Sequence, residues 1–157
     1  MERRKIKIYI DTSVVGGYYD AEFEIETKLF FEEIKQGRFQ IIYSSVTDDE
    51  LLGAPQRVRD LIKELPSKYV TRVDLTEEAV ALADTYLLEK VVGQTSREDC
   101  FHIAIATLHQ VDILLSWNFK HIVNYTRIRG YNGVNMKLGY PTIDIRSPKE
   151  IVYNEED

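Results

Sequence analysis

Cysteine is nearly absent from this sequence, because Cys100 is the only one in 157 residues. A single cysteine cannot form an internal disulfide, and chains without disulfides are typical of the reducing cytosol. Long hydrophobic runs are missing as well, since no apolar stretch approaches the roughly 18 residues of a membrane-spanning helix. The basic N-terminus lacks the pattern of a signal peptide, because its short apolar part runs directly into Asp11. We therefore predict a cytoplasmic protein that does not associate with membranes.

Basic residues are outnumbered, with 20 Lys and Arg against 26 Asp and Glu and a formal net charge of −6. This balance excludes a protein that holds nucleic acid mainly by bulk electrostatics, but not an enzyme that contacts phosphates through a local patch. The 44% apolar and 29% charged residues are typical of a globular chain rather than a disordered or fibrous one. We expect a single domain over residues 1–157, with its core at about 5–145 and an acidic tail at 154–157.

Strand-like and helical segments alternate along the chain. Short apolar runs predict strands at Lys5–Ile10, Phe39–Tyr43, Tyr69–Val73, Asp112–Leu115 and Thr142–Ile145. Helical spacing, together with N-cap, glycine and proline signals, predicts helices at Glu22–Lys35, Thr47–Leu52, Gln56–Leu65, Thr76–Lys90, Glu98–Gln110 and His121–Asn135. The alternation indicates an α/β protein, a three-layer α/β/α sandwich around a mostly parallel sheet of about five strands.

Polar side chains follow the predicted strands at or near their carboxyl ends. Asp11 closes the first strand, Glu50 falls in the first turn of the helix after the second, and Asp99 falls in a first turn after a short loop. The fourth strand is followed by Ser116 and Asn118. Ligands in parallel sheets bind beyond the carboxyl ends of the strands, so we expect these side chains to converge at one edge.

Each acid also has a purely structural interpretation. The segments Thr47–Glu50 and Ser96–Asp99 both fit the capping box, in which a hydroxyl is followed three residues later by an acid. Asp11 can cap a helix that begins at the next residue, and Asn118 can be a turn residue. Capping explains each acid separately, but it does not explain why all of them follow strand ends. We therefore favour a shared site over separate caps.

Grouped carboxylates repel one another unless a cation lies among them. Ligands that are all oxygen atoms suit Mg²⁺ or Mn²⁺ rather than zinc, and none of the three histidines is spaced for a zinc site. His102 follows Asp99 by three residues on the same predicted helix, so it either lines the site or is a buried histidine whose ring nitrogens are satisfied. Cys100 is interpreted as a small core residue.

With these residues placed, the chain resembles the PIN-domain family, which includes the toxin ribonucleases of bacterial toxin–antitoxin pairs. The resemblance runs from about Lys5 to Ile145 and is carried by the segments YIDTSVV, SSVTDDELL, DCFHIAIA and DILLSWNFKHI. It implies a PIN-like fold, and it departs from the family at Asn118, where an amide replaces the frequent fourth aspartate. Asp112 is a poor substitute, because it falls at the amino end of its strand and therefore at the opposite edge of the sheet.

The resemblance implies a metal-dependent endoribonuclease that hydrolyses RNA with Mg²⁺ or Mn²⁺ as its cofactor. The implied site has metal ligands, a possible water-orienting acid and supporting polar groups: Asp11 and Asp99 as principal ligands, Glu50 as a ligand or water orienter, Asn118 and Ser116 as outer members, and Ser13 as hydrogen-bonding support. Candidate phosphate-binding residues are Lys120, Arg97, Arg127 and Arg129, with Tyr125 and Tyr131 as candidates for base stacking. An antitoxin protein and a second copy in a homodimer are the implied partners.

Two other classes of protein compete with the nuclease. The first is a PIN-fold binding module for RNA or an antitoxin, with catalysis weak or lost, which the amide at Asn118 and the acidic net charge favour. The second is a phosphatase or phospho-receiver domain. A phosphatase of that type has Asp-x-Asp after its first strand, whereas this chain has Asp11 and Ser13 there, and a receiver has paired acids near its start. The sequence therefore favours the nuclease.

Overall fold

The central sheet has five strands, all of them parallel. The computed structural model describes residues 4–152, so the predicted acidic tail at 154–157 lies outside the described residues. The strands are β1 (Ile6–Ile10), β2 (Phe39–Ser44), β3 (Val70–Val73), β4 (Ile113–Leu115) and β5 (Asp144–Arg146). They lie in the order β3-β2-β1-β4-β5, and each neighbouring pair is parallel. The predicted parallel sheet is therefore confirmed.

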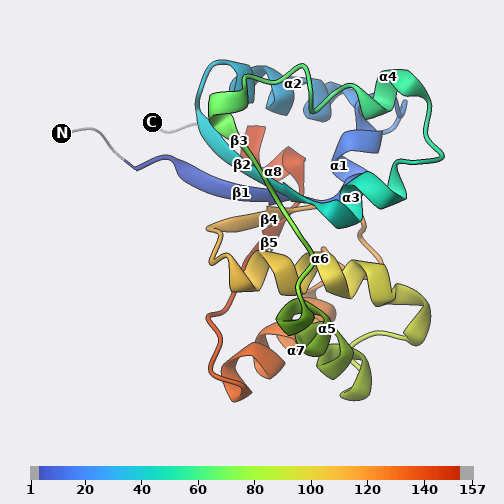
Figure 1. Cartoon of the computed structure of the whole chain (residues 1–157), viewed down its shortest axis with the longest axis vertical. Helices are drawn as coiled ribbons and strands as arrows, with labels where there is room; N and C mark the ends of the chain where they lie inside the picture. Colours follow the sequence, from blue (N-terminus) through green and yellow to red (C-terminus); the bar gives the residue numbers. More distant parts are fainter. Residues whose placement is uncertain (1–3, 153–157) are drawn as a thin grey trace.

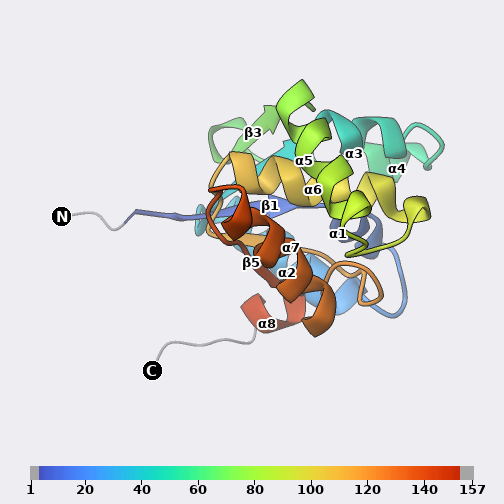
Figure 2. The same ribbon diagram turned by 90° about the horizontal axis from the view of Figure 1, so that it is seen from below.

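Helices cover both faces of this sheet. They are α1 (Thr12–Gly17), α2 (Glu24–Lys35), α3 (Ser45–Glu50), α4 (Gln56–Arg59), α5 (Glu77–Leu88), α6 (Arg97–Leu108), α7 (Tyr125–Lys137) and α8 (Pro148–Val152), with short 3₁₀ turns η1 (Ser67–Tyr69) and η2 (Gln94–Ser96). Helices α1, α2, α4 and α8 lie on one side of the sheet, and α5, α6 and α7 lie on the other (Figure 1; Figure 2 gives the view from below). This arrangement is the predicted three-layer, PIN-like sandwich. None of the helices within residues 4–152 is long and apolar enough to cross a membrane.

Alternation along the strands creates two hydrophobic cores. Successive side chains of a strand point to opposite faces of the sheet. Accordingly, Tyr9 and Leu114 belong to the core beneath α5, α6 and α7, whereas Ile8 and Leu115 belong to the core beneath α1, α2 and α8. A central strand that buries both faces must be apolar there, and this requirement explains the uninterrupted hydrophobic residues Ile8–Ile10 in the buried part of β1.

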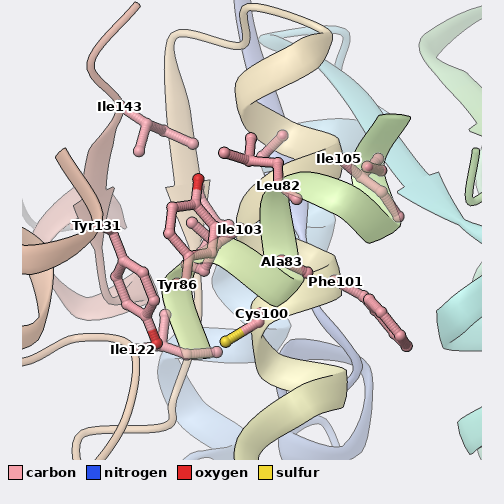
Figure 3. Packing of buried hydrophobic residues seen from close by; sticks show 14 of the residues in the cluster. Leu82, Ala83, Tyr86, Cys100, Phe101, Ile103, Ile105, Ile122, Tyr131 and Ile143 are labelled. Carbon is pink, nitrogen blue, oxygen red and sulfur yellow. The ribbon is translucent and has the colours of Figure 1, made fainter. Parts of the chain in front are cut away.

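Helix α6 is buried almost all round, as its apolar sequence predicts. It lies between the sheet and the pair α5 and α7 (Figure 1), and every residue from Cys100 to Thr107 is buried. Figure 3 shows its packing, with Cys100 facing the rings of Tyr86 and Tyr131, whose centroids lie 5.1 Å apart in an edge-to-face contact. Cys100 is therefore a core residue, as expected.

Several predicted boundaries differ from the structure. The helix expected over Gln56–Leu65 ends at Arg59, because the chain continues in turns that bury Leu61, Ile62 and Leu65 against the sheet. The helix expected to begin at His121 begins at Tyr125. The last strand lies one to two residues later than expected, since Asp144 pairs with β4. Helix α8, five residues long, was not predicted, and α1 is the helix that the capping interpretation of Asp11 allowed.

The strand order creates a switch point beside β1. After β1 the chain proceeds to β2 and β3 on one side, and it later crosses to β4 and β5 on the other. The segments that leave the carboxyl ends of β1 and β4 therefore diverge, one into α1 and the other into the loop before α7. In open parallel sheets this divergence forms the crevice in which ligands bind.

The close approach of α1 to Trp117 supplies a test of the packing at this point. A Cβ at Gly17 would lie 2.8 Å from Trp117 Nε1 and 2.9 Å from Thr27 Oγ1, which are hydrogen-bonded to each other. We expect Gly17→Ala to lower the free energy of unfolding by about 1–3 kcal/mol through overpacking. Gly16 is the matched control, because a Cβ there meets nothing within 4 Å. Gly16→Ala should be neutral or stabilising by up to about 1 kcal/mol in urea unfolding. Equal effects of the two substitutions would contradict the packing described.

Candidate active site

Asp11 is buried at the carboxyl end of β1, with only 3% of its surface exposed. It caps α1 by accepting a hydrogen bond from the Val14 amide at 3.2 Å, so the capping interpretation is correct for this residue. Its two oxygens also accept hydrogen bonds from Ser13 Oγ at 2.6 Å and Ser116 Oγ at 2.5 Å. Burial raises the pKa of Asp11, while nearby His102 and the three donors act in the opposite direction. These hydrogen bonds therefore offset the cost of burying the carboxylate, which also lines a cavity.

Two serine hydroxyls connect the ends of β1 and β4 around Asp11. Ser13 Oγ donates to Asp11 and accepts from the backbone amide of Trp117 at 2.8 Å. Ser116 Oγ donates to Asp11 and accepts from the amide of Asn118 at 2.9 Å. Each hydroxyl thus both orients the carboxylate and fixes the loop that leaves β4. The structure places both supporting serines beside Asp11.

Asp99 lies in the first turn of α6, as predicted, but it is not part of a capping box. The N-cap residue Ser96 makes no side-chain capping hydrogen bond. Burial raises the pKa of Asp99 to about 6, and the negative charges of Asp11 and Glu50 contribute in the same direction. Two of the predicted acids therefore repel each other at the same edge of the sheet.

Asn118 faces this edge with its amide nitrogen. Its Nδ2 donates to Asp99 Oδ2 at 3.3 Å. Its carbonyl oxygen accepts from the backbone amides of Lys120 at 3.2 Å and His121 at 2.9 Å, which identifies the orientation of the amide group. Asn118 therefore stabilises a turn, as its structural interpretation predicts, and is also a neighbour of the acids. It presents a donor where a fourth carboxylate would present acceptors.

Glu50 ends α3, and the prediction that it falls in a first turn is wrong. The helix begins three residues earlier than a cap at Thr47 would allow, because Ser44 caps it through the amide of Val46. Glu50 Oε1 accepts hydrogen bonds from Thr12 Oγ1 at 2.7 Å and from His102 Nε2 at 2.6 Å. Burial would raise the pKa of Glu50, but His102 and Thr12 outweigh it and lower the pKa.

His102 is buried and both of its ring nitrogens have partners. Besides the contact with Glu50, Nδ1 lies 2.6 Å from the hydroxyl of Tyr9, which lies 2.7 Å from Ser44 Oγ. The histidine also lines the cavity, so both sequence interpretations of it hold. Sequence reasoning assigned no role to Tyr9 or Thr12. The available signal was a single phenol within an otherwise aliphatic, fully buried stretch of β1.

These side chains surround a cavity of about 220 Å³ at the switch point. It is lined by Asp11, Thr12, Ser13, Glu50, Asp99, His102 and Asn118. Within residues 4–152, no group of three or more His, Cys, Asp or Glu side chains is arranged to hold a metal ion as the side chains stand. The fit to a hard cation rests instead on two mutually repelling carboxylates, Asp11 and Asp99, among oxygen-bearing neighbours.

The candidate RNA-binding residues do not line the cavity. Arg97 pairs with Asp84, Arg127 donates to a backbone carbonyl, and Arg129 donates to the hydroxyl of exposed Tyr125. Lys120 is exposed and lies two residues beyond Asn118, which does line the cavity.

A stacking role for Tyr131 is wrong. Its side chain is fully buried, and its hydroxyl donates to the carbonyl of His121 (Figure 3 shows the ring within the core). Asp112 lies at the opposite edge of the sheet, as predicted, where it accepts from the amide of Lys7 near the start of β1.

Comparison with known proteins places the fold. No protein-family model matches the sequence, and no curated protein sequence matches it. Three solved structures are similar over 98% of their own chains: VapBC2 from Rickettsia felis bound to a promoter DNA fragment (13% identity, 90% of this chain, TM-score 0.55), FitAB bound to the IR36 DNA fragment (12%, 95%, 0.57) and DNA-bound VapBC from Salmonella typhimurium (16%, 91%, 0.55). At this level of identity the likeness shows a shared fold.

The raised pKa of Asp99 predicts a dependence of stability on pH. Its usual value is 3.8 and its folded value is about 6, so the folded state binds the proton more tightly and stability falls as pH rises from about 4 to about 6. We expect Asp99→Asn to raise the free energy of unfolding at pH 7 by on the order of 1 kcal/mol, discounted for partial solvent screening, and to have little effect at pH 4. Thermal unfolding at the two pH values checks this. Glu98→Gln, an exposed neighbour, is the control, and an equal gain from it would contradict the assignment.

Proposed function

We propose that this chain is a metal-dependent endoribonuclease that acts as the toxin of a toxin–antitoxin pair. The observation that carries the proposal is that buried Asp11 and Asp99 line one cavity at the switch point, where burial and then the charge of Asp11 raise the pKa of Asp99 to about 6. Two such carboxylates are costly in the absence of a counter-charge, and a phosphodiester is a substrate whose hydrolysis a divalent cation assists. The fold agrees with the resemblance to PIN-domain ribonucleases described above.

Asp11 and Asp99 are the residues that would hold Mg²⁺ or Mn²⁺. The ion, when bound, supplies charge neutralisation for the phosphate and makes a nearby water more acidic. Ser13 and Ser116 keep Asp11 oriented through short hydrogen bonds, and Asn118 keeps Asp99 oriented through its amide nitrogen. These three polar neighbours therefore fix both carboxylates before any substrate arrives, which reduces the cost of organising the site.

Glu50 is the group that would orient and deprotonate the attacking water. Its Oε1 is held by Thr12 and His102, and its lowered pKa keeps it ionised at neutral pH. In the reaction the water oxygen forms a bond to phosphorus, one P–O ester bond breaks, a water proton passes to Glu50, and the leaving oxygen takes a proton from solvent. A general base in this role contributes roughly 10²–10⁴-fold to a rate.

The partners follow from the same proposal. RNA is the substrate, and exposed Lys120, two residues beyond the cavity residue Asn118, can contact a phosphate. Arg97 is equally near Asp99 in sequence, but it is paired with Asp84. The solved structures that share this fold are toxin–antitoxin structures, which supports an antitoxin protein as a second partner, and a homodimer is proposed on the resemblance alone.

A second candidate is a binding module that retains the fold and takes RNA or an antitoxin without cleaving it. The observation in its favour is Asn118, which gives the acids a hydrogen-bond donor in place of a fourth carboxylate. Calorimetry with Mn²⁺ separates the two candidates. Binding that is lost in both Asp11→Asn and Asp99→Asn supports the enzyme, whereas no binding at millimolar Mn²⁺ supports the module.

The nuclease assay uses a mixed RNA pool with Mg²⁺ or Mn²⁺. We expect cleavage that EDTA abolishes and that Asp11→Asn and Asp99→Asn reduce to background, because each removes a carboxylate of the cation site. Glu50→Gln should lower the rate by about 10²–10⁴-fold. Glu98→Gln, on the same turn as Asp99, should cleave at the wild-type rate. Cleavage that survives EDTA and both aspartate substitutions would falsify the proposal, since the products would come from a contaminant.

Asn118→Asp tests whether the fourth position limits cation binding. The carbonyl oxygen that caps the turn is retained as a carboxylate oxygen, while the donor that faces Asp99 becomes a second negative charge. We expect Mn²⁺ affinity, measured by calorimetry, to rise by about 10-fold or more. Asn118→Ala is the control and should not tighten binding. An unchanged affinity for Asn118→Asp would place the cation away from this side of the cavity.

A further inference from the structure

We propose that His102 is a positioning residue that holds Glu50 in its working orientation through a buried hydrogen-bond chain anchored on β2. This inference rests on the proposed function, because the role that it gives to Glu50 is the orientation of the attacking water. It concerns three residues beyond the acids themselves, namely Ser44, Tyr9 and His102.

The chain of contacts is continuous from the sheet to the cavity. Ser44 Oγ lies 2.7 Å from the Tyr9 hydroxyl, which lies 2.6 Å from His102 Nδ1, and His102 Nε2 lies 2.6 Å from Glu50 Oε1. Ser44 is fully buried, Tyr9 is fully buried and His102 is 2% exposed, whereas the Glu50 side chain is 32% exposed. The chain therefore runs from the interior to the one member that water can reach.

The donor and acceptor of each hydrogen bond between Ser44 and Glu50 follow from the groups at the two ends of the series. The amide of Val46 donates to Ser44 Oγ, so the Ser44 hydroxyl hydrogen is available to Tyr9. Burial raises the pKa of Tyr9, which keeps its hydroxyl hydrogen available to His102 Nδ1. Nε2 then carries the ring hydrogen and donates it to the carboxylate of Glu50. In this direction every buried hydroxyl hydrogen of the chain has an acceptor.

This arrangement leaves one oxygen of Glu50 for the reaction. Oε1 accepts from both His102 and Thr12, while Oε2 has no hydrogen-bond partner within residues 4–152. A carboxylate fixed through one oxygen presents the other in a defined direction, which is what a water-orienting group requires. In this proposal His102 acts through Glu50 rather than directly on the substrate or the cation.

A purely structural role accounts poorly for the same residues. His102 is the only imidazole on the buried stretch Cys100–Thr107 of α6, where its neighbours are otherwise small, aliphatic or aromatic. An apolar side chain at this position would fill the space without burying polar atoms, which is expensive unless every atom is paired. The hydrogen-bonded series that pairs these buried polar atoms ends at Glu50, which lines the cavity. The cost of burying them is therefore linked to the site.

The first experiment needs neither metal nor RNA. The ¹⁵N shifts of the His102 ring in the metal-free protein report which nitrogen carries hydrogen. We expect Nε2 to carry it in the wild type, and Glu50→Ala to allow the hydrogen to move to Nδ1 because the acceptor is gone. Asp49→Ala, an exposed neighbour on α3, should leave the ring unchanged. A wild-type ring with its hydrogen on Nδ1 alone would overturn the proposal.

The second experiment is a double-mutant cycle of His102 and Glu50, measured by the kinetics of RNA cleavage. His102→Asn cannot reach Glu50, whereas His102→Gln places an amide donor near the position of Nε2. We expect His102→Asn to lower kcat by about 10–100-fold with KM unchanged, and His102→Gln to restore part of the loss. In the Glu50→Gln background His102→Asn should have no further effect, because His102 acts through Glu50.

The two experiments separate the two proposals. RNA cleavage with additive losses in the cycle refutes the positioning role and leaves the ribonuclease intact. Complete absence of RNA cleavage refutes the ribonuclease, and the positioning of Glu50 by His102 is then decided by the ring shifts alone. Thermal unfolding of each variant, with melting temperatures close to that of the wild type, confirms that the losses do not come from unfolding.

Discussion

The burial of Asp11 at the carboxyl end of β1 is the constraint on which the rest of this structure depends. A carboxylate that is 3% exposed needs donors, and it obtains them from Ser13, Ser116 and the amide of Val14. Those three contacts join β1, α1 and the loop after β4 at a single point. The all-parallel sheet makes this possible, since it brings the carboxyl ends of β1 and β4 to the same edge.

The second acid gives the site its chemistry. Asp99 arrives from α6, which is held against the sheet by the core shown in Figure 3, so it cannot move away from Asp11 without disturbing that packing. Burial and the nearby charge of Asp11 together raise the pKa of Asp99. Glu50 differs from both, because His102 and Thr12 lower its pKa. Three acids at one edge thus divide into a repelling pair that suits a cation and a single ionised group that suits a proton acceptor.

Much of the fold and part of the site could be predicted from the sequence. The alternation of apolar runs and helical spacing was enough for the parallel sheet and for Asp11 at a strand end. The first residue of α3 was not predictable, because Ser44 and Thr47 both offer a hydroxyl that can cap the helix. The pairing of β2 with β3 continues as far as Ser44, and this makes Ser44 the cap. The link between Tyr9 and His102 joins residues 93 positions apart, and Tyr131 is buried only because α7 packs against α5. Such contacts depend on tertiary packing rather than on local pattern.

The central claim is that Asp11 and Asp99 together hold a divalent cation. The most direct measurement is the anomalous scattering of a crystal soaked in Mn²⁺. The account predicts one strong peak in contact with a carboxylate oxygen of each of these two residues, within the cavity of about 220 Å³. A soaked crystal with no peak in that cavity, or with its strongest peak elsewhere on the molecule, would contradict it.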